Sequence, residues 1–366
     1  MRFSDLGSEV ELENKQRINL SAHAYTVLLQ DASLFFPSHK TETGGIPSGI
    51  LNHVFYQFRE SAESSIEEAL QTRRQSLNTL LQPMSSEAAR QEVADLLLVE
   101  YRSELEQKRN ARLSQKGFSF SFRIDTANLR ELSSEQVQRE RVHYQDKVGL
   151  YWKAVLEEFC EKPYSEREKI YQKEVWNRIL AAISRKKRLK LELRSSYQAA
   201  AGSSKICYMK PLSILQDSEK MYNYLTGMMR GEQDEAWKCG AIRLSSIVGC
   251  KEQERSGSVS QEEKRTIETL IKHNGVQFLS SGKQTQTIRV RLTKQGVALY
   301  HRLLHLRPMF ADRHQEGDAW IYEFDCLPWQ IEIYFFKFGQ DAIVLEPSAL
   351  AQRLREKYLR ALDSYQ

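Results

Sequence analysis

Two short segments in the first half of the chain alternate strictly between apolar and polar residues, Lys15–Leu20 and Phe118–Asp125. Successive side chains of a β-strand point to opposite faces, so each segment predicts a strand with one apolar face. Ile18 and Leu20 share that face in the first strand. A single strand with two helices cannot bury its apolar face alone. We therefore expect the two segments to pair with each other within one chain.

Helical patterns follow both predicted strands in the same order. Ser21 and Asp125 stand where a helix N-cap is needed. Gly149–Phe159 then repeats the pattern of Gly49–Phe58. The apolar stripes that follow the first strand are Tyr25, Leu28, Leu29 and Ala32, and then Ile50, Leu51, Val54, Phe55 and Phe58. We interpret residues 15–70 and 118–165 as two half-modules of a degenerate internal repeat.

A long helix is predicted between the half-modules at Ser85–Arg109. Its apolar side is assigned to Val93, Leu96, Leu97 and Leu105. The helix would connect the two halves.

The strand-helix-helix order resembles a ribbon-helix-helix module, which inserts a two-stranded ribbon into the major groove of DNA. The polar face of the first strand carries Lys15, Arg17 and Asn19. Arg and Asn are the usual readers of base edges, so these residues are candidates for contact with bases or phosphates. An ordinary solvated strand face explains the same pattern, and the sequence leaves both interpretations open.

The C-terminal part of the chain predicts an α+β unit. Ser260 and Glu263 form a capping box after a polar linker, Lys251–Ser260, and the helix they begin ends near Asn274-Gly275. The next elements are a strand, a helix and two strands, and Pro347 suits the first position of the last helix. The three strands are assigned to Thr287–Leu292, Trp320–Phe324 and Gly339–Glu346. This order predicts a ferredoxin-like arrangement.

The central residues 180–252 contain a basic run beside short strand patterns. The cations of the run are Arg185, Lys186, Lys187, Arg188, Lys190 and Arg194. Leu189, Leu191 and Leu193 alternate with charged residues, as in a strand with one solvated face. Such a cluster suits the phosphate backbone of a nucleic acid, although a charge run is often only a solvated face.

The central segment resembles the WYL domain of prokaryotic regulators, and the C-terminal unit resembles the extension that follows that domain. The matching segments are the helix end Ile179–Ile183, the proline-containing strand Tyr208–Leu215, the name-giving strand Asn223–Gly227 and the closing strand Ala241–Ile247. Two positions depart from the family pattern. Asn223 stands where the family has Trp, and Ser245-Ser246 replaces Asp-Arg.

The resemblance implies a small SH3/Sm-like β-barrel with a concave patch for a nucleic acid or a nucleotide-like ligand. The positions that match the family's patch are Tyr224 and Arg243. An aromatic face and a guanidinium suit stacking on an unpaired base and pairing with a phosphate. The alternative for Tyr224 is a core tyrosine. Lys210 and Tyr197 are weaker candidates, chosen because they lie near these strands in the sequence.

The whole chain, including a lead-in helix at Tyr164–Tyr171, looks like the WYL-domain accessory proteins encoded beside type VI-D CRISPR RNA nucleases. This implies a ribbon-helix-helix-like domain (1–165), a WYL domain with its lead-in helix (166–253) and a dimerising extension (254–366). We expect a non-catalytic cytoplasmic protein of antiviral defence that binds single-stranded RNA, enhances the nuclease and forms a homodimer. The alternative is a WYL transcriptional regulator that binds DNA through its N-terminal domain and senses a ligand.

Other features of the sequence argue against different classes of protein. The formal net charge is only +5, so bulk charge alone does not imply nucleic-acid binding. The five cysteines form an odd set without a CxxC pair, which disfavours a disulfide framework and a zinc finger. The apolar cluster Val93–Val99 is too short for a membrane span, and the N-terminus has no signal-peptide pattern.

No sequence motif indicates an enzyme. The chain has no P-loop, no GxSxG and no HExxH motif. His301 and His305 have the i, i+4 spacing of zinc ligands on a predicted helix, but leucines dominate that segment. We therefore expect no catalytic residue, no metal and no cofactor.

Overall fold

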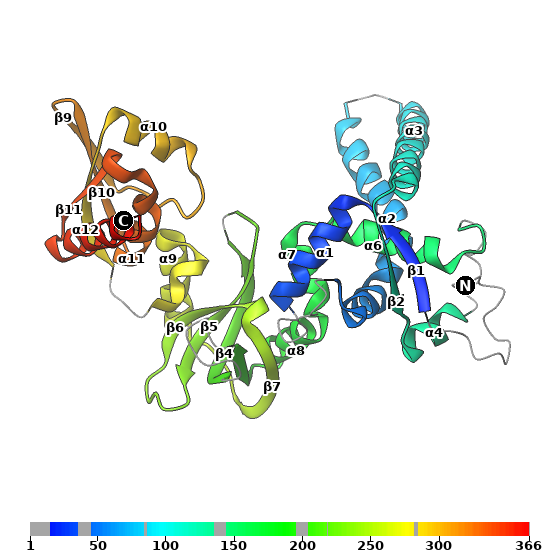
Figure 1. Cartoon of the computed structure of the whole chain (residues 1–366), viewed down its shortest axis with the longest axis horizontal. Coiled ribbons are helices and arrows are strands. Elements are labelled where there is room, and N and C mark those ends of the chain that lie inside the picture. The colour runs from blue at the N-terminus through cyan, green and yellow to red at the C-terminus, as the bar shows by residue number, and fades with distance from the viewer. Residues whose placement is uncertain are drawn as a thin grey trace. The chain divides into compact units, whose positions relative to one another are not determined.

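A computed structural model describes residues 15–35, 45–83, 86–134, 144–194, 204–217, 219–281 and 285–365. The chain divides into two compact units, Met1–Lys173 and Glu174–Gln366. The described residues form helices and three small antiparallel sheets, so the fold is of the mixed α+β class (Figure 1). The division into three domains that the resemblance implies remains a prediction.

The two alternating segments of unit 1 pair with each other, as predicted. Strand β1 (Lys15–Leu20) runs antiparallel to β2 (Phe118–Arg123), with Leu20 opposite Phe118. Ile18 and Leu20 are buried, and so is Phe122. Phe118 is exposed instead and stacks on Tyr25 of the following helix. The second strand therefore buries less of its apolar face than its pattern predicts.

Helices enclose one face of this ribbon. They are α1 (Ala22–Phe35), α2 (Ser48–Leu80), α3 (Glu87–Ser114), α4 (Thr126–Leu132), α6 (Val148–Cys160) and α7 (Tyr164–Tyr171). Phe55 of α2 stacks on Trp152 of α6 at 3.9 Å between ring centroids, in the middle of the core. Both predicted caps are present, because the Ser21 hydroxyl accepts from Ala24 N and the Asp125 carboxylate accepts from Asn128 N.

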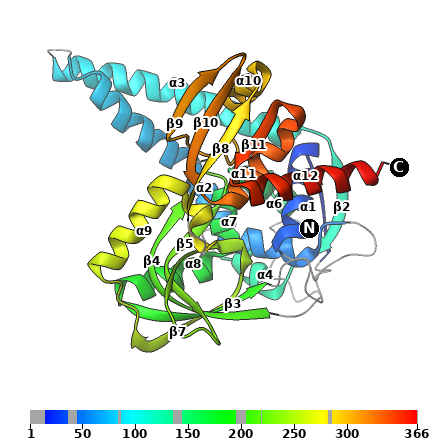
Figure 2. The same ribbon diagram turned by 90° about the vertical axis from the view of Figure 1, so that its left-hand side faces the viewer.

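Helices α2 and α3 lie side by side as a long hairpin in both views (Figure 1 and Figure 2). α2 has 33 residues and continues well past the predicted end near residue 70. The predicted apolar side of α3 is wrong, because Leu96 is 66% exposed while Ala94 and Leu98 are buried. The reason is the partner helix: Leu70 and Leu77 of α2 pack against Ala94 and Leu98, and the hairpin turns the other leucines outward.

Helix α8 (Lys173–Ser184) begins at the boundary between the units, and unit 2 continues from it into a five-stranded sheet. Its strands are β3 (Lys187–Arg194), β4 (Ser204–Gln216), β5 (Asn223–Gly231), β6 (Lys238–Arg243) and β7 (Ile247–Ser256), in the order β6-β5-β4-β3-β7. A single 3-10 turn, η2 (Leu244–Ser246), joins the two edge strands. The sheet must therefore curl until its edges approach at that end. Residues 251–256, predicted to be a linker, form the end of β7.

The C-terminal part of unit 2 has the order β-α-β-β-α-β, which contains one more strand and one more helix than the sequence predicts. It comprises β8 (Gln286–Leu292), α10 (Lys294–Arg302), β9 (Asp312–Glu316), β10 (Ala319–Cys326), α11 (Pro328–Phe335), η4 (Phe336–Asp341), β11 (Ala342–Glu346) and α12 (Ser348–Asp363), with strand order β11-β8-β10-β9. β9 and α11 were not foreseen. Pro347 is the N-cap of α12 rather than its first residue.

Helix α9 (Gln261–Asn274) and the 3-10 helix η3 (Val276–Ser281) connect the two sheets of unit 2. The predicted capping box is present, with Glu263 N donating to the Ser260 hydroxyl at 3.1 Å and Ser260 N donating to the Glu263 carboxylate at 2.7 Å. The helix ends at Gly275, as predicted. Ile267 of α9 and Leu279 of η3 pack on Met228, so these helices cover part of the five-stranded sheet.

Candidate nucleic-acid interface

The polar face of the five-stranded sheet is built from alternate residues of neighbouring strands. In β3, Leu189 is buried in the core, so Arg188 and Lys190 lie on the opposite face. The strand register continues this face across the sheet, because Lys190 lies opposite Tyr208 and Tyr208 lies opposite Arg230. Part of the predicted basic run therefore lies on one face together with residues of β4 and β5.

Cations from three strands surround one indole ring on this face. The guanidinium carbon of Arg188 lies 4.9 Å from the centroid of the Trp237 ring, Lys210 Nζ lies 5.0 Å from it, and the guanidinium carbon of Arg230 lies 5.2 Å from it. Arg230 also lies 5.5 Å from the ring of Tyr208. We call these five residues the Trp237 cluster.

Sequence reasoning identified Arg188 and Lys210 of this cluster but missed Tyr208, Arg230 and Trp237. The sequence places Tyr208 in a predicted strand and indicates no functional role for it. A signal for Arg230 was present, because a residue six positions after Tyr224 on one strand shares its face. Trp237 immediately precedes β6, and nothing in the sequence alone places it over Arg188.

The predicted patch of Tyr224 and Arg243 lies at the other end of the same face. The two residues are directly opposite each other on β5 and β6. The Arg243 guanidinium lies 3.5 Å from the ring centroid of Tyr222, a residue that the sequence did not single out. Tyr224 and Arg230 are six residues apart along β5, which corresponds to about 20 Å. The helices that cover Met228 lie between these two ends.

The remaining residues of the basic run have different positions. Arg185 and Lys186 lie in the turn before β3 rather than on the strand, and Arg185 pairs with Glu252 at 3.5 Å. Lys187 Nζ donates to the carbonyl of Glu254 at 3.1 Å. Arg194 closes the strand. Tyr197 lies outside the described residues.

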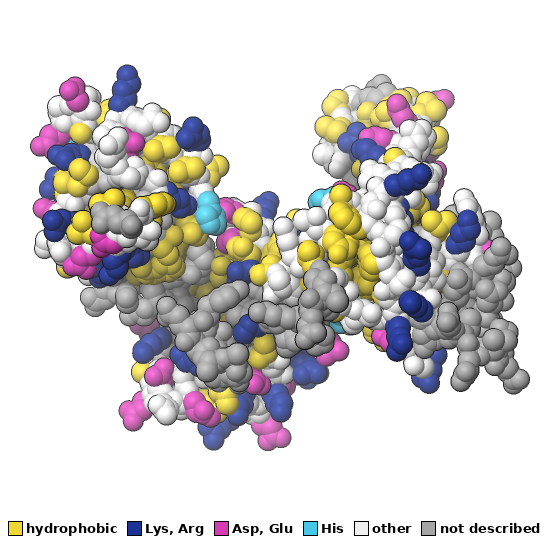
Figure 3. All heavy atoms as spheres, viewed as in Figure 1, with side chains coloured by type: hydrophobic (Ala, Val, Ile, Leu, Met, Phe, Trp, Pro, Cys, Tyr) yellow, Lys and Arg dark blue, Asp and Glu magenta, His cyan; other side chains and the backbone are white. Residues whose placement is uncertain are grey.

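The ribbon of unit 1 presents a second basic surface. Lys15 and Arg17 are exposed on β1, and Lys15 lies opposite Arg123 of β2. Figure 3 shows Lys and Arg side chains following one another over the ribbon. Asn19 does not suit the predicted base-reading role, because its amide donates to Ser119 Oγ at 2.7 Å and accepts from Gly117 N at 2.9 Å. These bonds join the end of β1 to the start of β2.

The two histidines with the spacing of zinc ligands do not share a helix. Helix α10 ends at Arg302, so His305 lies beyond it and instead contacts Glu219 at 2.5 Å. Among the described residues, no group of three or more His, Cys, Asp or Glu side chains is arranged to hold a metal ion. The described helices include none that is long and apolar enough to cross a membrane.

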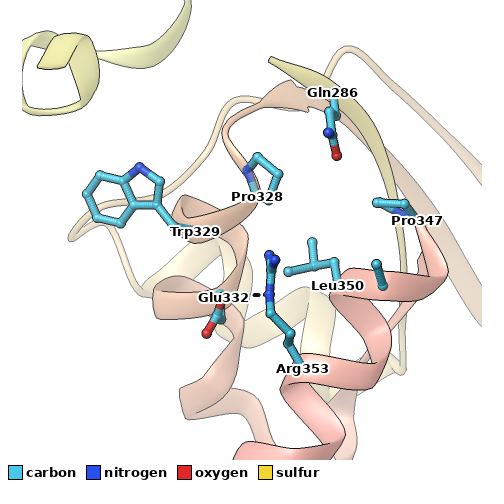
Figure 4. A pocket seen from close by; sticks show the side chains of 8 residues that line it. Gln286, Pro328, Trp329, Glu332, Pro347, Leu350 and Arg353 are labelled. Carbon is cyan, nitrogen blue, oxygen red and sulfur yellow. Dashed lines mark ion pairs between the residues drawn. The ribbon is translucent and has the colours of Figure 1, made fainter. Parts of the chain in front are cut away.

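Two cavities lie in the C-terminal part of unit 2. One of about 760 Å³ is lined by Trp329 and by Glu332, which pairs with Arg353 at 3.6 Å (Figure 4). Lys357 also contacts Glu332, and the negative charge of the Glu332 carboxylate is therefore already balanced. The second is an apolar groove of about 700 Å³ between β11 and α12.

A solved structure described as a CRISPR Cas-related protein is similar to this chain over almost its whole length. The two are 20% identical, the match covers 96% of this chain and 94% of the other, and the TM-score is 0.70. A weaker match, 16% identical with a TM-score of 0.26, links 60% of this chain to 33% of proteasome accessory factor B/C of Arthrobacter aurescens. No family model matches the sequence, and no curated protein matches it. The first similarity shows that this chain shares the fold of the CRISPR Cas-related protein.

Proposed function

We propose that this chain is a non-catalytic accessory protein of a type VI-D CRISPR system that binds single-stranded RNA and enhances the RNA-guided nuclease. The observation that carries the proposal is the polar face of the five-stranded sheet, where Arg188, Lys190 and Arg230 lie beside Tyr208 and Trp237. Cations interleaved with aromatic rings suit an unpaired strand, because its phosphates and its base faces are both accessible. The fold shared with a CRISPR Cas-related protein supports the assignment to such a system.

Equilibrium binding to single-stranded RNA and to duplex DNA of equal length tests the proposal. We expect tighter binding to the RNA at two salt concentrations, with a negative salt slope in both cases because neutralised phosphates release counterions. Addition of the protein to a type VI-D nuclease should also raise the rate of target-RNA cleavage. Tighter binding to a specific duplex would instead favour a transcriptional regulator that uses the β1–β2 ribbon.

We further propose that the protein is a homodimer held through its C-terminal sheet. β11 is an edge strand, and such a strand presents backbone groups that can pair with another chain. Beside it, exposed Ile343, Leu359 and Leu362 line the apolar groove between β11 and α12. A second copy that docks in the same way would cover both grooves around a two-fold axis.

A further inference from the structure

The Trp237 cluster carries more positive charge than the carboxylates around it balance. Lys210 Nζ pairs with Glu263 at 3.2 Å, so its charge is balanced. Arg188 and Arg230 have no carboxylate partner among the described residues. The exposed Asp234 carboxylate, in the connection after β5, accepts from Gly231 N at 3.0 Å instead. Two guanidinium groups thus lie on one indole without an anion between them.

These two guanidinium groups are also short of hydrogen bonds. The Nε of Arg188 and the Nε of Arg230 are buried and have no hydrogen-bond partner in the described structure. Burial lowers the pKa of Arg188, and the positive charges of Arg230 and Arg255 lower it further. A group whose charged form is penalised in this way is stabilised by an anion that supplies both charge and acceptors.

The indole has a positioning role in this arrangement. Arg188, Lys210 and Arg230 all lie about 5 Å from the centre of the Trp237 ring, where the electron-rich ring faces attract cations. The ring therefore holds together charges that would otherwise repel each other. Because these cations already lie against the ring, the cluster is better suited to a phosphate than to a stacked base.

We propose that Arg188 and Arg230, positioned by Trp237, form a phosphate subsite that binds one phosphodiester of a single-stranded nucleic acid. The proposal rests on the proposed RNA-binding function and names the group of the ligand that this end of the polar face takes. Arg is suited to this role because its planar fork donates paired hydrogen bonds to phosphate oxygens. The subsite lies at the opposite end of the face from Tyr224 and Arg243, so the two ends contact different nucleotides of one strand.

Single substitutions in the full-length protein test the subsite, with labelled single-stranded RNA as the probe over a range of salt concentrations. We expect Arg188→Ala and Arg230→Ala each to weaken binding roughly 10- to 100-fold and to make the log–log salt slope shallower by ~0.7 for each phosphate that is no longer neutralised. Arg360→Ala, which removes an exposed arginine of α12, is the matched control and should leave both values close to those of the wild type.

Trp237→Leu separates positioning from bulk charge, because it removes no charge. We expect it to weaken RNA binding severalfold, whereas Trp237→Phe retains a ring and should restore most of the affinity. Circular dichroism and thermal melting show whether Trp237→Leu is still folded. If it is not, Trp237→Phe and the two arginine variants test the subsite. Wild-type affinity in both arginine variants would overturn the subsite.

Two further probes distinguish the subsite from the function on which it rests. Inorganic phosphate should change the tryptophan fluorescence of the wild type but not that of Trp237→Leu or Arg230→Ala. RNA binding by the wild type that is undiminished in the arginine variants rejects the subsite alone. The second probe is single-stranded DNA: absence of RNA binding, with a retained phosphate response and arginine-dependent binding of single-stranded DNA, rejects the proposed RNA-binding function alone. A phosphate response without arginine-dependent binding of either single-stranded RNA or single-stranded DNA identifies a site for free phosphate and overturns the phosphodiester proposal.

Discussion

At the scale of single residues, the polar face shows how a strand pattern identifies a surface but not its chemistry. Alternation places Arg188 and Lys190 on one face of β3, and the strand register adds Arg230 of β5 to that face. The indole that lies against two of these cations belongs to Trp237, just before β6, so only the folded chain reveals it. The same applies to Tyr222, which stacks on Arg243 although sequence reasoning selected Tyr224.

The double substitution Tyr224→Ala with Arg243→Ala should weaken binding of single-stranded RNA without unfolding the protein. Loss of base–aromatic stacking is worth roughly 1–3 kcal/mol, which corresponds to ~5- to 150-fold in affinity if Tyr224 stacks on a base. Arg17→Ala, on the ribbon, should have a smaller effect. Fluorescence anisotropy measures both values. Near-wild-type affinity with an intact melting profile would exclude this end of the face from binding.

Two buried tyrosines should make the free energy of unfolding of the C-terminal core fall as the pH rises in the alkaline range. Tyr300 donates to the Pro308 carbonyl at 2.7 Å, and burial raises its pKa from 10.0 to about 12. Burial raises the pKa of Tyr334 as well. Because the pKa is higher in the folded state, this contribution to stability is complete below about pH 10 and is lost as the pH rises toward 12.

We therefore expect the urea midpoint to fall between about pH 9 and about pH 11. Tyr300→Phe should reduce the size of that fall, although it also removes the hydrogen bond to Pro308. An equal fall in the variant and the wild type would show that Tyr300 makes no contribution to the pH dependence.

At the scale of elements, the capping box of α9 connects helix stability with the polar face. Glu263 accepts from Ser260 N and also pairs with Lys210, so one carboxylate begins the helix and balances a cation of the Trp237 cluster. The bond from Ser260 N and the neighbouring lysine lower the pKa of Glu263. Since Ile267 of α9 packs on Met228, the same helix also covers part of the sheet.

Ser260→Ala should destabilise the protein by about 1 kcal/mol, because it removes an N-cap side chain. Ser258→Ala, two residues earlier and outside the helix, is the control and should be close to neutral. Urea unfolding measures the difference. Equal midpoints for the two variants would mean that the cap makes no net contribution to stability.

Local patterns predicted most elements, and tertiary packing accounts for the misses. The paired strands, the capping box and the strands β8, β10 and β11 follow from alternation, capping residues and turns. The apolar side of α3 could not be predicted in this way, because leucines occur on more than one side of that helix. Packing against Leu70 and Leu77 of α2 determines that Leu98 is the buried one. β9 was missed for another reason: all five of its residues are exposed, so it carries no apolar alternation.

At the scale of the whole molecule, the proposed dimer depends on a surface that the fold leaves exposed. Ile343 of β11 and Leu362 of α12 are 45% and 57% exposed. Removing the residues after Gln253 would not test this dimer interface by itself, because it would also remove the packing of Ile267 and Leu279 on Met228 of the sheet. Substitutions in the full chain leave that packing intact.

Ile343→Lys combined with Leu362→Lys should convert the dimer into a monomer, since two charges would have to be buried against an apolar groove. Leu304→Lys, at another exposed leucine of the same unit, is the control and should remain dimeric. Light scattering at several concentrations reports the mass. A dimer that persists in the double variant would place the interface elsewhere.

The β1–β2 ribbon is made from one chain, and this has a consequence for recognition. A ribbon assembled from two chains dissociates on dilution, whereas this one persists at any protein concentration. It also lacks a two-fold axis, because Arg17 of one strand lies opposite Ser121 of the other. A sequence read by its two strands would therefore have no reason to be palindromic. The residues of each strand can differ, because each strand contacts its own half of the target.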